Sequence, residues 1–394
     1  MSNLTERFPS WPMADENQEK ELLEALRSNQ WWRMSGTKVK EFERVFAQMH
    51  HAKHTLAVTN GTHAIKLALH SLGVKPGDEV IVPAFTFIST ALPVISLGAI
   101  PVPVDVDPGT FCLDPVKVRE AVTPRTVGMI PVHMAGHLCD MDQLQQIADE
   151  FHLFIIEDAC HAHGGEWKGK RAGSMGDAGV FSFQQFKLMT AGEGGALITN
   201  AQDLYDQAFL YHNVGRPVGD KKYQHLVEGS NYRISEFQAA VLLPQTARLA
   251  EQNKRREYNA QVLDAEMKEI DGIIPQIRQE ECTIHTHYMY MFYYNPVEFG
   301  GITRERFVEM LNEQGIPAYI AYTQIHDTPI FKQFVADLGD NYAFPNQLHC
   351  PVSKKIAEEV IWIHHRALLG DAESVKGIAQ TVRELQASTK AKLV

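Results

Sequence analysis

The sequence predicts an α/β protein built from two domains. Over the first two-thirds of the chain, short apolar segments with strand character alternate with helical segments. Near-continuous apolar strands between helices are typical of a sheet that is covered on both faces. A chain of 394 residues is also long for a single hydrophobic core. We therefore expect a large N-terminal domain at residues 1–255 and a smaller C-terminal α+β domain at residues 256–394.

The large domain is expected to begin with an N-terminal helix and then to alternate strands with helices. Apolar residues at helical spacing and helix-start signals predict helices at 17–29, 60–73, 114–122 and 141–150. Apolar segments predict strands at 78–84, 100–106, 127–133, 152–158, 178–183 and 195–199.

A long helical stretch from Ser235 to about Met267, interrupted by Pro244, could bridge the two domains. The elements expected beyond it are strands at 286–294 and 316–322 and helices at 303–314 and 374–387. These elements are consistent with a small α+β domain.

Composition excludes several classes of function. The net charge is −11, and no cluster of Lys and Arg is long enough to follow a phosphate backbone, so we expect no nucleic-acid partner. No apolar run is long enough to cross a membrane, and residues 1–7 lack the features of a secretory signal. The five cysteines are scattered without metal-ligand spacing, which indicates reduced thiols and a cytoplasmic protein.

The segment Asn60-Gly61-Thr62 follows an apolar run and opens a predicted helix. Free backbone amides and the helix dipole make such a place suitable for an anion. Taken alone, the segment fits a simple helix cap equally well. Together with the residues described next, it indicates a phosphate site.

Asp158 and Lys187 both follow apolar strands, where open α/β sheets bind their ligands. This layout of strand, Asp, second strand and Lys is the one that holds pyridoxal phosphate (PLP). Lys187 would form a Schiff base with the cofactor, Asp158 would face the pyridine nitrogen, and the Ser182 hydroxyl would contact the phosphate. The neighbouring Glu157 points to the opposite face of its strand and is the weaker candidate.

For other residues in this region, the sequence allows either a functional or a purely structural role. Phe87 could stack on the cofactor ring or could be a core aromatic. His133 and His137 invite a metal interpretation, but no helix aligns them and no further ligands stand at a defined spacing, so we expect no metal site.

Taken together, these motifs resemble the sugar-aminotransferase family of fold-type-I PLP enzymes, over essentially the whole chain. The segments that carry the resemblance are Asn60-Gly-Thr62, Pro83-Ala-Phe-Thr-Phe87, Pro131-Val-His133, Glu157-Asp-Ala159, Phe181 to Gly195 and Gly229 to Phe237. The resemblance implies a large domain with a mostly parallel seven-stranded sheet. It also implies that Lys187 carries the cofactor and moves the proton during amino transfer, with Asp158 at the pyridine nitrogen.

Further residue roles follow only from the resemblance. His161 stands where many members have Gln near the phenolic oxygen of the cofactor. Gly61, Thr62 and Ser182 match the phosphate site, and Phe87 matches the stacking aromatic. Asn231 matches a residue that reaches the phosphate from the neighbouring subunit, which implies a homodimer.

The chain departs from the usual family pattern in Gln30-Trp-Trp-Arg-Met-Ser-Gly36, at His161 and at Thr323-Gln-Ile-His326. These features resemble a subgroup whose members act on free, carboxylate-bearing cyclic compounds rather than on nucleotide sugars. Residues available to contact such a substrate are Trp32, Arg33, Arg233 and Arg366, of which the arginines could clamp a carboxylate.

The expected activity is therefore a two-step amino transfer from L-glutamate to a carboxylate-bearing keto-sugar. The acceptor favoured by the resemblance is 8-oxo-3,8-dideoxy-manno-octulosonate, which would give the 8-amino sugar of lipopolysaccharide. The alternative is a role like that of 3-amino-5-hydroxybenzoate synthase. A dehydratase of the same fold would replace the Lys by His, and a non-catalytic PLP-binding protein would not need Asp158, Ser182 and Lys187 together.

Overall fold

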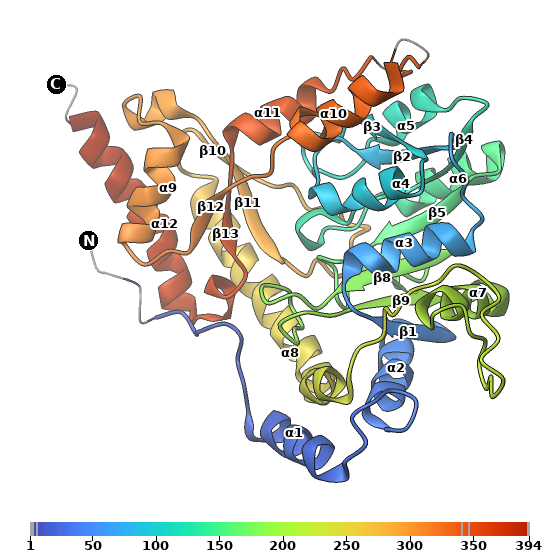
Figure 1. The fold of residues 1–394 in the computed structure, drawn as a ribbon. Coiled ribbons are helices and arrows are strands. Elements are labelled where there is room, and N and C mark those ends of the chain that lie inside the picture. The colour runs from blue at the N-terminus through green and yellow to red at the C-terminus, as the bar shows by residue number, and fades with distance from the viewer. Residues whose placement is uncertain (1–3, 5–6, 340–341, 346, 392–394) are drawn as a thin grey trace.

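A seven-stranded sheet forms the centre of the larger part of the molecule (Figure 1). The computed structural model describes residues 4, 7–339, 342–345 and 347–391. The strand order is β1-β9-β8-β5-β4-β2-β3. Strands β8, β5, β4, β2 and β3 pair in parallel, whereas β9 is antiparallel to both of its neighbours. The expected mostly parallel seven-stranded sheet is thus confirmed.

The strands of this sheet are β1 (His54–Val58), β2 (Glu79–Pro83), β3 (Ile100–Val104), β4 (Thr126–Met129), β5 (Phe154–Asp158), β8 (Ala178–Ser182) and β9 (Gly195–Thr199). The surrounding helices are α1 (Glu16–Ser28), α2 (Lys38–Met49), α3 (Gly61–Ser71), α4 (Leu92–Ser96), α5 (Pro115–Ala121), α6 (Met141–Phe151) and α7 (Gln202–His212). A short hairpin consists of β6 (Glu166–Trp167) and β7 (Lys170–Arg171).

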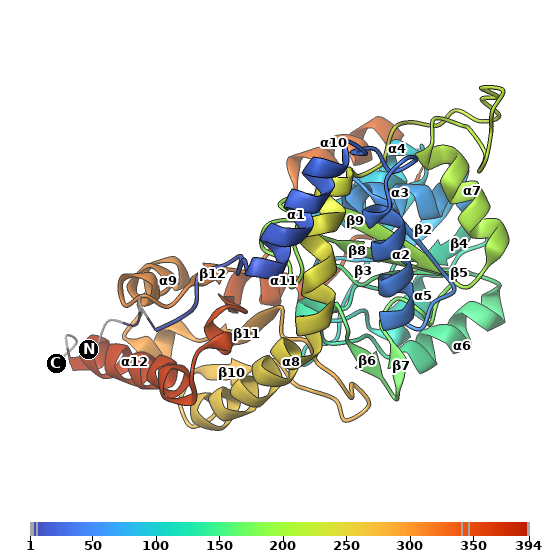
Figure 2. The same cartoon turned by 90° about the horizontal axis from the view of Figure 1, so that it is seen from below.

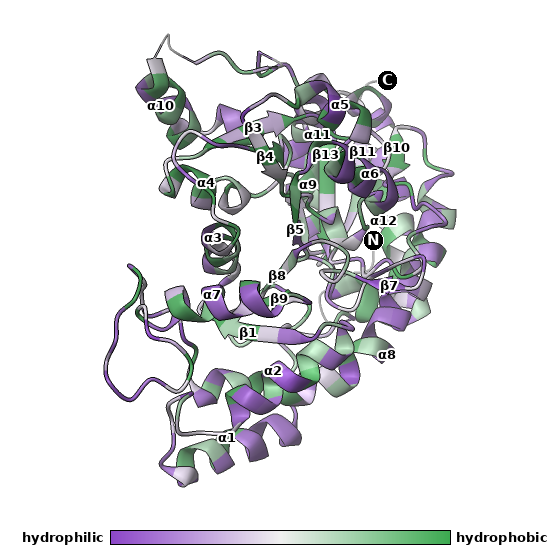
Figure 3. Cartoon of the chain, turned by 90° about the vertical axis from the view of Figure 1, so that its right-hand side faces the viewer, coloured by the Kyte–Doolittle hydropathy of each residue, from purple (hydrophilic) through white to green (hydrophobic). Residues whose placement is uncertain are grey.

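Both faces of the sheet are covered, as the apolar strands predict. On β2, Val80 and Val82 pack into the core beneath α3, α4 and α7, and Ile81 packs into the core beneath α2, α5, α6 and α8. The alternation follows from the two-residue period of a strand. Peripheral helices such as α1 and α6 carry large hydrophilic areas (Figure 3).

Helix α8 (Glu236–Met267) is continuous for 32 residues and passes through Pro244. The expected interruption at the proline does not occur. Side-chain amides of Gln18 and Gln245 donate to the Val241 carbonyl, in the turn that a proline disturbs. Helices α1 and α2 pack alongside α8 (Figure 2), and the expected domain boundary at residue 255 falls inside this helix.

The C-terminal part contains a second, antiparallel sheet in the order β10-β11-β13-β12. Its elements are β10 (Ile273–Pro275), β11 (Met289–Tyr294), α9 (Arg304–Glu313), β12 (Ala318–Ile320), α10 (Pro329–Leu338), α11 (Pro351–Glu359), β13 (Val360–His364) and α12 (Ala372–Lys390).

Two segments pack into the hydrophobic core of the other part of the molecule. Leu4 and Phe8 pack into the core of the C-terminal part, although we expected residues 1–255 to form one domain. Conversely, Phe331 of α10 packs into the core beneath α3. No helix in the described residues combines the length and hydropathy that a membrane span requires.

Candidate active site

A cavity of about 580 Å³ lies at the carboxyl ends of β5 and β8, where open parallel sheets bind ligands. Both parts of the chain line it. Seven of the predicted site residues meet here: Gly61, Thr62, Phe87, Asp158, His161, Ser182 and Lys187. Residues that the sequence did not indicate also line it, among them Thr90, Gln184, Tyr288, Tyr319, Tyr322, Trp362 and His364.

The N-terminus of α3 opens onto this cavity. The Asn60 side chain accepts a hydrogen bond of 2.8 Å from the His63 amide, so Asn60 caps the helix. The amides of Gly61 and Thr62 belong to the first turn, which has no carbonyl partners of its own within a helix. A Cβ atom at Gly61 would lie 2.9 Å from the Cys160 sulfur and 3.1 Å from the Ser182 Cβ. Glycine therefore lets this helix end approach Ser182 and leaves an anion site between them.

Asp158 ends β5 with its carboxylate at the cavity. One oxygen accepts a hydrogen bond of 3.0 Å from the Thr90 hydroxyl, and the other accepts a bond of 3.2 Å from the Cys160 amide. These two bonds fix the orientation of a side chain that is 6% exposed. An oriented carboxylate in such a place suits a cationic ring nitrogen.

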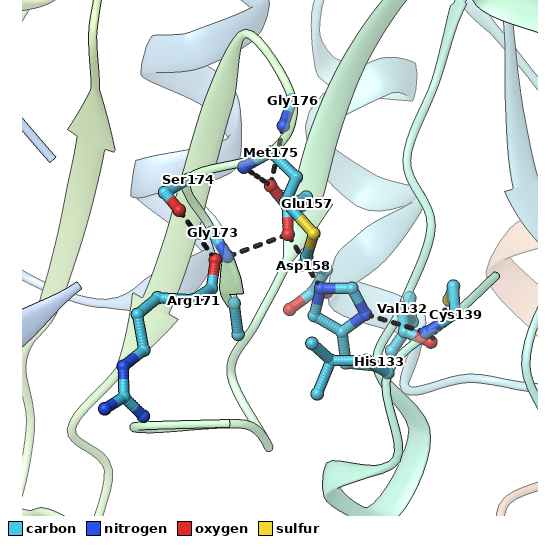
Figure 4. A network of polar contacts seen from close by, with 12 residues as sticks. Val132, His133, Cys139, Glu157, Asp158, Arg171, Gly173, Ser174, Met175 and Gly176 are labelled. Atoms are coloured by element: carbon cyan, nitrogen blue, oxygen red, sulfur yellow. Dashed lines mark hydrogen bonds and ion pairs between the residues drawn. The ribbon is translucent and has the colours of Figure 1, made fainter. Parts of the chain in front are cut away.

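Glu157 points away from the cavity, as expected, into a buried network (Figure 4). Its carboxylate lies 2.9 Å from His133 Nε2. It also accepts three backbone hydrogen bonds of 2.6 to 2.7 Å from the loop at residues 173–176. The other ring nitrogen of His133 accepts from the Cys139 amide. This network anchors the end of β5 behind Asp158.

The imidazole of His137 is also hydrogen-bonded within the protein. Its Nδ1 lies 2.7 Å from the Leu138 carbonyl, and its Nε2 accepts a bond of 3.1 Å from the Gln279 amide. Both nitrogens of the ring therefore have protein partners. No disulfide joins the five cysteines, all of which lie in the described part of the chain.

The Lys187 amine lies over the ring of Tyr288, 4.4 Å from its centroid. The imidazole of His161 stacks on the same ring at 4.3 Å and 23°. Burial, with a contribution from Lys187, lowers the pKa of His161 well below its usual value. His161 is therefore neutral at physiological pH, and its buried Nδ1 has no partner among the described residues. A neutral imidazole with a free nitrogen can hydrogen-bond a bound molecule.

Aromatic side chains form the rest of the cavity wall. Tyr319 of β12 stacks on Trp362 of β13 at 4.5 Å and 21°. Phe87 is 54% exposed and lies 5.9 Å from Tyr322. An aromatic ring left this exposed is not a core residue, so its surface is available to a flat ligand.

The predicted substrate contacts are not among the residues that line this cavity. Arg33 is 4% exposed and makes a bidentate ion pair of 2.9 Å with Glu43. Removing it from that pair would leave a buried carboxylate without a countercharge, so Arg33 is held in the fold and is not available to clamp a substrate. Arg366 donates to the Pro9 carbonyl.

The other two predicted substrate contacts, Trp32 and Arg233, lie close to Asn231 and outside the cavity. The Arg233 guanidinium lies 5.9 Å from the Trp32 ring and donates to Asn213, which pairs with Asn231 in a short β-bridge. We call Trp32, Asn231 and Arg233 the 231 patch. In a single chain these residues do not meet Lys187 in the cavity.

Residues 12–383 match the model of the DegT/DnrJ/EryC1/StrS aminotransferase family. The chain belongs to this family. It is 44% identical to 3-amino-5-hydroxybenzoate synthase of Amycolatopsis mediterranei, over 96% of this chain and 97% of the relative. It is 36% identical to the L-glutamine:2-deoxy-scyllo-inosose aminotransferase of Streptoalloteichus tenebrarius, over 97% and 95%.

Solved structures agree with this assignment. The crystal structure of 3-amino-5-hydroxybenzoic acid synthase superposes with a TM-score of 0.88 at 43% identity, over 98% of this chain and 99% of that one. An aminotransferase from Psychrobacter cryohalolentis superposes with a TM-score of 0.87 at 29% identity, over 97% and 100%. The chain is a PLP-dependent aminotransferase of fold type I.

The residues in the cavity fit this cofactor. The α3 N-terminus and Ser182 suit its phosphate, the fixed Asp158 carboxylate suits its ring nitrogen, and Lys187 offers an amine. The unpartnered Nδ1 of His161 is available to an oxygen of the ring.

Proposed function

We propose that this aminotransferase moves the amino group of L-glutamate or L-glutamine to a carbonyl of a small cyclic or sugar-acid acceptor without a nucleotide. The observation that carries the proposal is the meeting of Lys187 and Asp158 in one cavity beside the α3 N-terminus. Bound PLP would supply an electron-accepting ring.

The roles that we assign to the side chains follow from their positions. Lys187 would hold the cofactor covalently, and its amine would move the proton during transfer. Asp158 would keep the ring nitrogen protonated, and Thr90 holds this carboxylate in place. His161 would hydrogen-bond a ring oxygen of the cofactor, and Phe87 would pack against the flat ring.

Among acceptors, a ring compound of the aminocyclitol or aminohydroxybenzoate type comes first in this proposal. The relatives described above are named for such compounds and include a glutamine-dependent enzyme. The 8-oxo-3,8-dideoxy-manno-octulosonate expected from the subgroup resemblance, and with it a role in lipopolysaccharide synthesis, remains a second prediction. A cytoplasmic location likewise remains a prediction from the cysteines.

We also propose a homodimer in which the 231 patch of each chain completes the cavity of the other. Lys187 is the only Lys or Arg among the described residues that line the cavity, yet the amino donor carries a carboxylate, as an acceptor of the aminohydroxybenzoate type also would. The partner subunit's Asn231 would reach the phosphate, and the partner subunit's Arg233 would supply the missing cation.

A half-reaction tests the proposed activity. Purified protein loaded with PLP is mixed with L-glutamate or L-glutamine in separate reactions, and the 2-oxo acid released is measured together with the pyridoxamine phosphate formed. We expect one equivalent of each per subunit with at least one donor. Absence of both products with both donors would contradict the proposal.

Mixed dimers test the shared site. Lys187→Ala and the double variant Asn231→Ala/Arg233→Ala should each be inactive alone. Co-expressed, they should form heterodimers in which one of the two cavities has all its residues, so activity should return. If activity does not return although heterodimers are isolated, the 231 patch does not serve the neighbouring cavity.

A further inference from the structure

Two aromatic side chains from distant parts of the chain hold the backbone immediately before Lys187. We propose that Trp11 and His365 are positioning residues for Lys187, because their ring N–H groups bind the peptide carbonyls of Gln185 and Phe186. The inference rests on the proposed role of Lys187 and extends it to residues outside the cavity.

The two hydrogen bonds are consecutive along the backbone. Trp11 Nε1 donates to the Gln185 carbonyl at 3.0 Å, and His365 Nε2 lies 3.0 Å from the Phe186 carbonyl. The donors reach the loop from residues 174 and 179 positions away along the chain. The two rings also contact each other edge to face, with centroids 4.4 Å apart. The two contacting rings therefore hold the backbone of the loop before Lys187 together.

Both donors can act only in the direction that the geometry requires. An indole nitrogen donates and never accepts. A backbone carbonyl only accepts, so His365 must carry its proton on Nε2. Burial, followed by the charges of His364 and Arg256, lowers the pKa of His365 well below its usual value, which keeps the ring neutral. Its Nδ1 is buried without a partner among the described residues, in agreement with this tautomer.

Trp11 is itself fixed on both sides. Arg366 donates to the Pro9 carbonyl at 3.2 Å, and Arg248 donates to the Met13 carbonyl at 2.6 Å. The guanidinium of Arg256, which is fully buried, lies 5.8 Å from the Trp11 ring. The N-terminal segment thus runs from the core of the C-terminal part to the loop that precedes Lys187, where contacts on both sides hold the Trp11 indole in place.

The loop before Lys187 needs donors from other segments, because its own amides at Gln185 and Phe186 already donate to other acceptors. The Gln185 amide donates to the Gly192 carbonyl, and the Phe186 amide donates to the Gln184 side chain. The carbonyls of Gln185 and Phe186 then fix the last two peptide planes before Lys187. A displacement of about 1 Å at a reacting group can cost on the order of 10²-fold in rate. Loss of either donor should therefore slow proton movement by Lys187 more than it weakens substrate binding.

The test uses variants of the full-length protein that remove one ring N–H and keep an aromatic side chain: Trp11→Phe and His365→Phe. His365→Gln is the conservative variant, because its amide nitrogen can occupy the position of Nε2. Trp167→Phe is the matched control, since Trp167 is buried and donates its indole N–H to Asp142, away from the Lys187 loop. Two quantities are measured: hydrogen exchange of the peptide that covers residues 183–189 without added PLP, and kcat and KM of the donor half-reaction with PLP.

We expect Trp11→Phe and His365→Phe to raise exchange in this peptide several-fold and to lower kcat about tenfold to 10²-fold with little change in KM. His365→Gln should recover most of both, and Trp167→Phe should change neither. Unchanged exchange at residues 183–189, or a loss of kcat equal to that of Trp167→Phe, would overturn the proposal. Exchange raised equally throughout the protein would also overturn it, because it would show a general structural role. Hydrogen exchange without PLP does not depend on whether Lys187 binds the cofactor. The role of Lys187 itself is tested separately, by mapping the residue that carries the cofactor.

Discussion

Glu157 and His133 lie 2.9 Å apart with no exposed side-chain surface, directly behind the residue that faces the cavity. Glu157 and Asp158 are neighbours on β5, and the two-residue period of a strand sends their carboxylates to opposite sides. One carboxylate anchors the end of the strand, and the other is free for chemistry. The position of Asp158 in the cavity thus depends on a network whose members Glu157 and His133 do not line the cavity.

Glu157→Ala should lower the free energy of unfolding by about 3–5 kcal/mol, because it leaves His133 and three backbone amides buried without their acceptor. Urea unfolding measures the change. Glu150→Ala is the control, since Glu150 is half-exposed and pairs with Arg119 at the surface, and it should cost at most about 1 kcal/mol. Equal losses of unfolding free energy in the two variants would show that the buried network stabilises the fold no more than a surface ion pair does.

Asp158→Asn should slow the donor half-reaction about 10²–10³-fold while PLP remains bound. The amide keeps the shape of the side chain, but it cannot hold a proton on the ring nitrogen. Stopped-flow absorbance follows the reaction. Asp149→Asn, a helix-surface change, should leave the rate as in the wild type. A rate for Asp158→Asn within threefold of the wild type would exclude the proposed role of Asp158.

Ser182→Ala should weaken PLP binding roughly tenfold to 10²-fold, the equivalent of one hydrogen bond to a charged group. Equilibrium titration of the protein with PLP gives the dissociation constant. Ser174→Ala removes a hydroxyl that donates to the Arg171 carbonyl instead, and we expect no change in PLP affinity. If both variants bind PLP equally well, Ser182 does not contact the phosphate.

Acid should destabilise the protein through its buried histidines. Burial lowers the pKa of His50 to about 3, and burial lowers the pKa of His163 well below its usual value. Because the unfolded chain takes up protons near pH 6.5 and the folded chain does not, this stability is complete above that pH. It is lost as the pH falls, by about 1.4 kcal/mol per pH unit for each such residue.

Urea unfolding between pH 7 and pH 5 tests this linkage. The free energy of unfolding should decrease as the pH falls in this window. At the acid end of this window, in His50→Gln the slope should be smaller by about 1.4 kcal/mol per pH unit, because one buried titrating group is gone. An identical slope in the variant and the wild type would show that His50 is not neutral in the folded state.

The sequence was most informative where a residue's role depends on its place at a strand end. Asp158, Ser182 and Lys187 follow apolar segments that the structure confirms as strands β5 and β8, so their meeting in one cavity was predictable. Gly61 and Thr62 were predictable for a similar reason, because a helix start is visible in the sequence.

Residues from the C-terminal part could not be predicted in the same way. Tyr288, Tyr319 and Trp362 reach the cavity only because the C-terminal part packs onto the core of the larger part. The strand β13, which carries Trp362, was not predicted, since it directly follows the charged helix α11 without a turn signal. Arg33 was misjudged because its partner Glu43 lies on the next helix, and burial of the pair depends on tertiary packing.

The most direct test of the account is to identify the residue that carries the cofactor. PLP-loaded protein is reduced with borohydride, digested and mapped by mass spectrometry, with Lys187→Ala treated in parallel. We expect a pyridoxyl group on Lys187 in the wild type and none in the variant. A pyridoxyl group on another lysine, or equal labelling of the two proteins, would contradict the assignment of Lys187 and of the site built around it.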